Sequence, residues 1–418
     1  MHHDTPATPA AAYLRAPVLL LMAVATGLCA GSNYFNQPLL HSIAVELQVS
    51  DATAALTVTL SQVAYALGLL FLVPLGDKLE RRGLAVGLML LAGGGLFISG
   101  YAGSFPVLLV GTVVTGFFSV AAQTLVPMAA TLSDTRRSGQ AVGWVMSGLL
   151  TGILLARSVA GVLSDVGGWS TVYRAAGVAM WGVAGALWWV LPRSRNPLPA
   201  SYLQTLRSLG SLAAQYPRLR SRSLLGALSF ASVSVMFSTM TLLLSGPVYQ
   251  MSDRDIGLLG LVGVAGALMA SVAGRLADRG WGQTTSAVAL GLLVCGWGSL
   301  WLGTSSLGWF LLGILVVDIA LPGLHISNQN VIYALAPEAR ARTNAVYMTS
   351  YFVGAAAGSA LGALAWRHGG WAATCATGAV LAGLAGIALR RDQQLLVLQR
   401  RANLADGGPG RNHTPALG

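Results

Sequence analysis

The sequence Val-Pro-Leu-Gly-Asp-Lys-Leu-Glu-Arg-Arg occupies residues 73–82 and forms a short polar segment between two long apolar runs. A related segment occurs once more in the chain, in the residues Gly274, Leu276, Ala277, Asp278, Arg279 and Gly282. Asp278 follows Asp77 by close to half the length of the chain, which has 418 residues. A repeat at this separation predicts that the chain is built from two related halves.

The composition indicates a polytopic membrane protein. Hydrophobic residues make up 54% of the chain and charged residues only 9%, whereas about 25% of the residues in a typical soluble domain are charged. The net charge of +11 does not indicate a nucleic-acid partner, because the basic residues are scattered in short loops without interleaved aromatic residues. The three cysteines lie in apolar runs without metal-ligand spacing, so we expect no metal and no cofactor.

Apolar segments of spanning length, about 20 residues, predict twelve transmembrane helices, six in each half. The expected spans are residues 17–40, 52–75, 84–102, 106–131, 141–163, 171–191, 224–246, 255–276, 284–304, 308–335, 344–366 and 371–389. We therefore predict an all-α integral membrane protein with two pseudo-symmetric six-helix bundles, at residues 17–191 and 223–390. Residues 1–16 and 391–418 are expected to be cytoplasmic tails, and residues 192–222 a cytoplasmic linker.

The linker and the basic residues predict the orientation of the chain. After three prolines, leucines recur at helical spacing beside Arg207, which predicts an amphipathic helix on the inner leaflet of the bilayer. Most Lys and Arg residues follow the even-numbered spans, so both termini are predicted to be cytoplasmic. The polar tail after Arg390 is expected to be disordered.

The two polar segments resemble a repeated loop of the major facilitator superfamily, whose pattern is G-x-L-A-D-R-x-G-R-R. The second copy matches closely, whereas the first copy has Val73 and Glu80 in place of the two glycines. The resemblance spans residues 17–390 and implies the major facilitator fold in a bacterial inner membrane, where we expect a monomer that transports a small solute by alternating access. It also implies a conformational latch formed by Asp77, Lys78, Arg81, Arg82, Asp278 and Arg279.

Small residues recur at four-residue spacing in the predicted fifth and eleventh helices. They are Gly148, Gly152, Ala156 and Ala160 in the fifth helix, and Gly354, Gly358 and Gly362 in the eleventh. Such faces let helix backbones approach closely within a membrane. Antiporters of the superfamily carry G-x-x-x-G-P-x-x-G-G in the fifth helix, but here Ala156 and Arg157 replace the Gly-Pro pair, which weakens the analogy and places a charge in this helix.

Asp318 and Arg157 are two charges predicted to lie deep in the bilayer. Each costs about 2.5 to 3.5 kcal/mol there unless it faces a cavity or a partner. Asp318 begins a polar stripe on the tenth helix that continues with His325, Asn328 and Gln329. We predict that Asp318 and His325 carry protons. The alternatives are that Asp318 and Arg157 form a structural ion pair and that His325 is an ordinary core residue.

Amide and aromatic side chains are predicted to line the solute site, because they can hydrogen-bond a solute and cover its apolar parts without adding fixed charge. With Arg157, the predicted solute-binding residues are Tyr34, Asn36, Gln37, Gln62, Tyr65, Gln123, Asn328, Gln329, Tyr347 and Tyr351. In the superfamily the first, fourth, seventh and tenth helices line the cavity, so the resemblance implies that Asn36, Gln37, Gln123 and Asp318 share it. The alternative for these side chains, including a possible gate formed by Tyr347 and Tyr351, is ordinary helix packing.

The sequence predicts a secondary transporter of a small organic solute. The resemblance to the bacterial drug:proton antiporter and sugar-efflux branch favours proton-coupled efflux. The nearest alternative is a proton symporter that imports a small organic acid or sugar, because the same residues serve either direction. A lipid-modifying membrane enzyme is a remote alternative, since the chain has no Gly-x-Ser-x-Gly, Walker or His-Glu-x-x-His motif, and we expect no enzymatic activity.

Overall fold

The computed structural model contains α-helices joined by short turns and 3-10 segments, and the part of the chain that it describes contains no strand. The described residues are 16–133, 138–194, 201–263, 269, 272–273, 275–276, 279–336 and 339–405. The predicted all-α architecture is therefore confirmed.

The first half crosses the bundle six times. Its helices are α1 (Ala16–Gly31), α4 (Leu56–Phe71), α5 (Arg81–Gly100), α6 (Phe105–Phe118) with its continuation α7 (Ala121–Thr131), α8 (Ser138–Gly167) and α9 (Trp169–Val190). Four short elements connect them, namely η1 (Gln37–Leu39), α2 (Leu40–Glu46), α3 (Asp51–Ala54) and η2 (Val73–Asp77). The first span is shorter than the sequence predicted, because α1 ends at Gly31 and the chain then continues through turns into η1 and α2.

The second half begins after the linker helix α10 (Tyr202–Gln215). Its helices are α11 (Pro217–Leu244), α12 (Asp253–Leu259) followed by η3 (Gly260–Gly263), α14 (Gly282–Leu302), α15 (Leu307–Leu335) and α16 (Arg340–Ala405). α16 consists of two helices joined at Gly369 and Gly370, whose backbone is not helical. The helix continues to Ala405, so the prediction of a disordered tail after Arg390 is wrong for residues 391–405. α11 begins before the boundary expected at residue 223.

The helices account for the predicted spans. By length and composition, eight helical stretches among the described residues could cross a membrane, and one of them, Arg342–Gln399, contains both parts of α16. α1 and α9 lie at the positions of the predicted first and sixth spans, and α12 and η3 lie at the start of the predicted eighth span. Of that eighth span, the described residues cover mainly its beginning.

The small-residue faces bring equivalent helices together in the two halves. In the first half, α8 lies so close to α1 that a Cβ atom on Gly152 would collide with the backbone of Gly27. In the second half, α16 lies equally close to α11, and a Cβ atom on Gly358 would collide with the backbone of Ala231. The predicted correspondence of the fifth and eleventh helices is thus visible in their packing.

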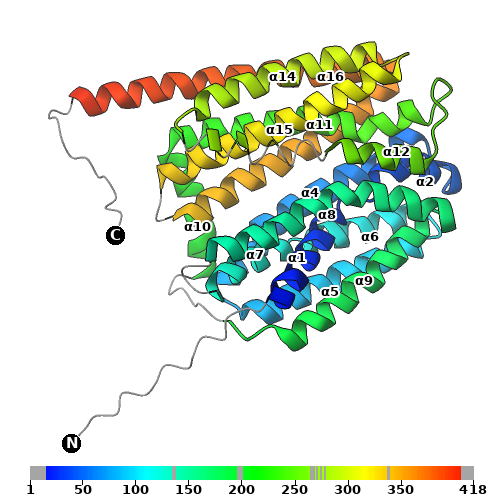
Figure 1. Cartoon of the computed structure of the whole chain (residues 1–418), viewed down its shortest axis with the longest axis horizontal. Helices are drawn as coiled ribbons and strands as arrows, with labels where there is room; N and C mark the ends of the chain where they lie inside the picture. The colour runs from blue at the N-terminus through cyan, green and yellow to red at the C-terminus, as the bar shows by residue number, and fades with distance from the viewer. Residues whose placement is uncertain are drawn as a thin grey trace, which may run out of the picture.

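Several hydrogen bonds join the two halves at one end of the bundle. Figure 1 shows α2 and α12 at this end, which we call the closed end, and shows α10 and the C-terminal part of α16 at the opposite, linker end. At the closed end, side chains of one half hydrogen-bond to the other half. These bonds are Ser42 Oγ to Asp253 Oδ2 (2.5 Å), Thr241 Oγ1 to the Gln37 carbonyl (2.6 Å) and Thr59 Oγ1 to Ser359 Oγ (2.9 Å).

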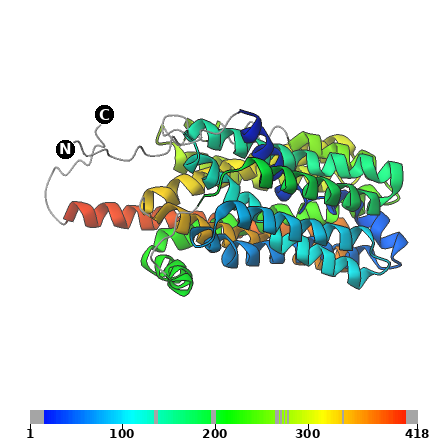
Figure 2. The ribbon, with the colours of Figure 1, turned by 90° about the horizontal axis from the view of Figure 1, so that it is seen from below.

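α10 projects from the linker end, as the orthogonal view in Figure 2 shows. A capping box between Ser201 and Gln204 begins this helix. Leu209 and Leu212 are buried, and the Tyr202 hydroxyl donates a hydrogen bond to the carbonyl of Phe71 in the first half (2.8 Å). The linker helix is therefore fastened to the bundle through one apolar face.

Candidate solute and proton site

Arg157 lies on α8 at the junction of the two halves. Its Nε donates a hydrogen bond to Oε1 of Gln37 (2.6 Å), in the short segment that follows α1. The guanidinium lies 3.8 Å from the ring centroid of Phe237 on α11 and 5.4 Å from that of Tyr34. The arginine is only 5% exposed, so groups from both halves replace most of the water around its charge.

Asp318 lies on α15 and faces the same 3-10 turn, η3, as Arg157. A Cβ atom on Gly260 would lie 3.1 Å from Cβ of Arg157, and one on Gly263 would lie 3.3 Å from Oδ2 of Asp318. The two side chains therefore flank one turn, which begins and ends with a glycine. They interact electrostatically without forming a direct ion pair, because the ion pairs of the described residues do not include this one. The alternative of a directly bonded structural pair is therefore wrong for this conformation.

The polar stripe on α15 continues into a chain of hydrogen bonds toward the linker end. His325 Nδ1 and the Tyr347 hydroxyl are 3.1 Å apart, and Asn328 Nδ2 donates to the same hydroxyl (3.4 Å). Oδ1 of Asn328 accepts from Nη1 of Arg222 (3.1 Å), and Nε of Arg222 donates to Asp392 (2.9 Å). The chain connects the middle of α15 to a buried ion pair between α11 and the end of α16.

Other predicted solute-binding residues of the second half are packed together. The Tyr351 ring lies 4.7 Å from the ring of His325 and stacks on Phe230 at 4.2 Å. Gln329 donates a hydrogen bond to Asn344 (3.2 Å). These contacts fit helix packing as well as a gate, so the gating role of Tyr347 and Tyr351 stays a prediction.

In the first half, Tyr65 reaches the other half through its ring. The Tyr65 and Phe352 rings are 4.5 Å apart, and Gln123 Nε2 lies 3.5 Å from the Tyr65 hydroxyl, to which it donates. Gln62 is buried, and its Oε1 has no hydrogen-bond partner among the described residues. Tyr65 is thus placed at the junction of the halves, where a solute site was predicted.

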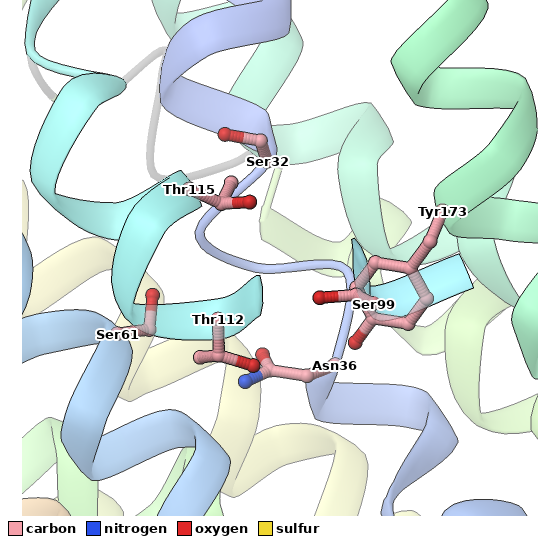
Figure 3. A pocket seen from close by; sticks show the side chains of 7 residues that line it. All are labelled: Ser32, Asn36, Ser61, Ser99, Thr112, Thr115 and Tyr173. Atoms are coloured by element: carbon pink, nitrogen blue, oxygen red, sulfur yellow. The ribbon is translucent and has the colours of Figure 1, made fainter. Parts of the chain in front are cut away.

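Asn36 faces a small polar cavity inside the first half instead of Arg157. Figure 3 shows the seven side chains that line it, from Ser32, Asn36, Ser61, Ser99, Thr112, Thr115 and Tyr173. The volume open to the centre of a water molecule is about 10 Å³, enough for about one water. Asn36 Oδ1, Ser99 Oγ and the Tyr173 hydroxyl are buried there without a hydrogen-bond partner among the described residues, so a bridging water would satisfy them.

The first predicted latch loop binds elements of its own half. Arg81 donates to the carbonyl of Gly76 (3.2 Å) and to Thr131 Oγ1 (3.1 Å). Arg82 donates to the carbonyl of Leu191 (3.1 Å) near the end of α9. Lys78 also has interaction partners, and Arg279 of the second loop is exposed. The side chain of Asp77 and the whole of Asp278 lie outside the described residues, so the latch stays a prediction.

Glu80, which departs from the superfamily glycine, caps the N-terminus of α5. Its carboxylate accepts hydrogen bonds from the backbone N–H groups of Arg82 (2.9 Å), Gly83 (2.7 Å) and Ser194 (3.0 Å). Burial raises the pKa of Glu80, but these three bonds and the charge of Arg82 outweigh burial and hold the pKa below its ordinary value. The departure from the pattern therefore has a structural role.

The sequence prediction missed three residues that matter for this geometry. Arg222 and Asp392 were assigned to the linker and to the tail, yet both are completely buried and bonded to each other. The available signal was an acid within the basic stretch that follows residue 390. Phe237, the ring beneath Arg157, looked like any apolar residue of the seventh span, so no local signal could have identified it. The described residues contain no cluster of side chains that could hold a metal ion.

An all-helical membrane architecture with related halves, and with charged and polar side chains at their junction, is typical of a membrane transporter. The family model of the Major Facilitator Superfamily matches residues 22–337 and 258–402. The chain belongs to this superfamily, so it is a multi-pass membrane transporter and not an enzyme.

Two related transporters align with most of the chain. An uncharacterized transporter of Escherichia coli O157:H7, YgaY, is 48% identical over 365 residues, which cover 87% of this chain and 93% of the relative. A probable sugar efflux transporter of Helicobacter pylori strain G27 is 27% identical over 342 residues, which cover 78% of this chain and 82% of the relative.

A solved structure shares the fold. The bacterial homolog of the human lysosomal transporter Spinster superposes with a TM-score of 0.69 at 16% identity, covering 95% of this chain and 99% of that chain. At this identity the likeness concerns the fold alone.

Proposed function

We propose that the protein moves a small organic solute across a bacterial inner membrane by alternating access and couples this movement to protons. The solute would bind at the junction of the halves, beside Arg157, Gln37 and Tyr65. The observation that carries the proposal is the placement of Arg157 and Asp318 on opposite halves of the chain around one turn, η3. Protonation of Asp318 would therefore change the electrostatic interaction between the two halves.

Asp318 is the proposed proton carrier. It is a carboxyl group in the middle of a membrane-crossing helix, where an ionised side chain is costly without a partner. It lacks a direct ion pair and lies near one fixed positive charge, Arg157. His325, which lies two helical turns along the same face, is the proposed second carrier.

The proposed orientation places both termini and the linker end in the cytoplasm, because most basic residues gather on that side. The closed end would then face the periplasm, and the structure would correspond to a state that opens inward. In this state the latch residues would be released from the other half, and they would engage it when the transporter opens outward. The transporter would work as a monomer.

Efflux by proton antiport is the first candidate for the direction of transport. It is supported by the relatives described as sugar efflux transporters. Import by proton symport is the second candidate, and the unpaired guanidinium of Arg157 favours it for an anionic solute. The same proton carrier would serve in both cases.

The substitution Asp318→Asn tests the proposal. The purified protein is reconstituted into liposomes, and a panel of a monosaccharide, a lipophilic cation and an aromatic sulfonate is tested under pH gradients of either sign. We expect gradient-driven accumulation of at least one solute by the unaltered protein. Asp318→Asn should abolish this accumulation, while exchange of labelled for unlabelled solute without a gradient continues.

The matched control is Asp51→Asn, which alters an acid at the start of α3 near the closed end, and it should accumulate solute as the unaltered protein does. Accumulation by Asp318→Asn at the unaltered rate would reject the proton-carrying role. The sign of the effective gradient decides between antiport and symport.

A further inference from the structure

The terminal nitrogens of Arg157 make no hydrogen bond to any residue that the structure describes. Only Nε makes a hydrogen bond among the described residues, to Gln37. The side chain is only 5% exposed, so the two terminal nitrogens carry a largely desolvated charge without a hydrogen-bond partner among the described residues. Arg157 thus presents two orientated donors, in the geometry that recognises a carboxylate or a sulfonate.

The surroundings of the guanidinium are aromatic. Phe237 lies beneath it at 3.8 Å and Tyr34 lies beside it at 5.4 Å, and both rings are more than nine-tenths buried. Aromatic rings cover an apolar body and favour a neighbouring cation. The combination fits a solute that has an anionic group at one end and an apolar or aromatic body.

We infer that the solute is an organic anion, whose carboxylate or sulfonate binds the two terminal nitrogens of Arg157 and whose apolar part lies against Phe237 and Tyr34. The inference rests on the proposed transport function and names its substrate class. It also predicts how the proton and the solute are linked.

An anion on Arg157 and an ionised Asp318 would compete for the same positive charge. Among the described residues, the elements packed against α15 are α11, α14, α16 and η3, and the ionisable groups that they bring into contact with its polar stripe lie at His325 or farther toward the linker end. These are Tyr347 and Tyr351 beside His325, and the Arg222 and Asp392 pair at the linker end. Of the charged side chains that the structure describes, Arg157 is therefore the one that acts on Asp318. Binding of an anion would favour the protonated carboxyl group, so anion and proton would bind together and move in the same direction. For an anionic solute this favours symport, the second of the two proposed directions of transport, over antiport.

Benzenesulfonate is a suitable probe, because it stays ionised near neutral pH and neither crosses a bilayer unaided nor carries a proton itself. Its neutral counterpart is benzenesulfonamide. Titration calorimetry on the full chain, in buffers of different ionisation enthalpy, measures both affinity and the protons exchanged. We expect benzenesulfonate to bind with proton uptake and the amide to bind at least about tenfold more weakly.

Variants test whether benzenesulfonate binds at Arg157. Arg157→Gln should weaken benzenesulfonate binding by about 10- to 100-fold, and Arg157→Lys should weaken it less, because it keeps the charge but loses the paired donors. Phe237→Leu offers a second test if the arginine variants do not fold, and it should weaken binding while keeping the volume filled. Arg174→Gln is the control, because Arg174 bonds to the Gly100 carbonyl at the closed end, and it should bind as the unaltered protein does.

Two results would overturn the inference: equal binding of benzenesulfonate and its amide, or proton release on binding. Loss of proton uptake in Asp318→Asn, with binding retained, supports it. A different result would contradict the proposed transport function and leave the substrate class intact. In that case benzenesulfonate would bind with proton uptake, but no pH gradient would drive its flux in liposomes. If a sugar or a cation is transported instead and benzenesulfonate does not bind, only the substrate class is wrong.

Discussion

Single residues at the start of α5 show why a departure from a sequence pattern can be informative. Glu80 replaces a glycine of the superfamily loop, and its carboxylate binds three backbone N–H groups, including that of Ser194 after α9. A glycine could not supply this cap. The carboxylate is therefore expected to stabilise the linker end of the first half whenever it is ionised.

Glu80→Gln should lower thermal stability at neutral pH, by about 0.5–2 kcal/mol for a lost cap. Because the pKa of Glu80 is lower in the folded protein than in the unfolded chain, its contribution is complete above the unfolded pKa and is lost as the pH falls through the folded pKa. The difference in melting temperature between the variant and the unaltered protein should therefore shrink in acid. If the difference in melting temperature stayed constant with pH, the carboxylate of Glu80 would not act as an ionised cap.

At the scale of helices, close packing of small residues could be predicted from spacing alone. The four-residue repeat in the fifth and eleventh spans indicated which faces approach a neighbour. It did not indicate which neighbour, because that depends on contacts between residues far apart in the chain. The structure supplies α1 and α11 as the partners.

Gly358→Ala should destabilise the second half by about 1–3 kcal/mol, because the added methyl group would meet the backbone of Ala231. Gly291→Ala in α14 is the matched control, since a Cβ atom there has no neighbour within 4 Å. It should leave stability unchanged or raise it by up to about 1 kcal/mol. Melting temperatures in detergent measure both effects, and equal losses in the two variants would contradict the packing argument.

The buried pair of Arg222 and Asp392 joins α11 to the C-terminal part of α16. Arg222→Met or Asp392→Leu alone should each cost about 3–5 kcal/mol, because the remaining charge stays buried without its main partner. The double variant should recover part of the loss. Thermal unfolding of the three variants tests this coupling, and strictly additive losses would show that the pair does not act as a unit.

Across the whole molecule, the fold and its two halves could be predicted from the sequence. The length of each apolar segment and the repeated loop can both be read from neighbouring residues. Arg157 and Asp318 were identified because a charge within an apolar run is conspicuous. Their position around η3, the ring of Phe237 and the distant partner of Arg222 could not be predicted, since each depends on the three-dimensional packing of separate helices. Asn36 illustrates the same limit, because its Oδ1 faces the small cavity of the first half and not Arg157.

Alternating access requires that the two halves move relative to each other around the site at Arg157. Thr59 and Ser359 lie on opposite halves, with their hydroxyl oxygens 2.9 Å apart. Cysteines at both positions, in a background without Cys29, Cys295 and Cys375, should form a disulfide that keeps the closed end shut. Transport is measured in liposomes with the panel solute that gives the largest flux, before and after oxidation. We predict that oxidation stops transport, that reduction restores it, and that neither single-cysteine variant is affected, whereas undiminished transport by the cross-linked protein would contradict the account.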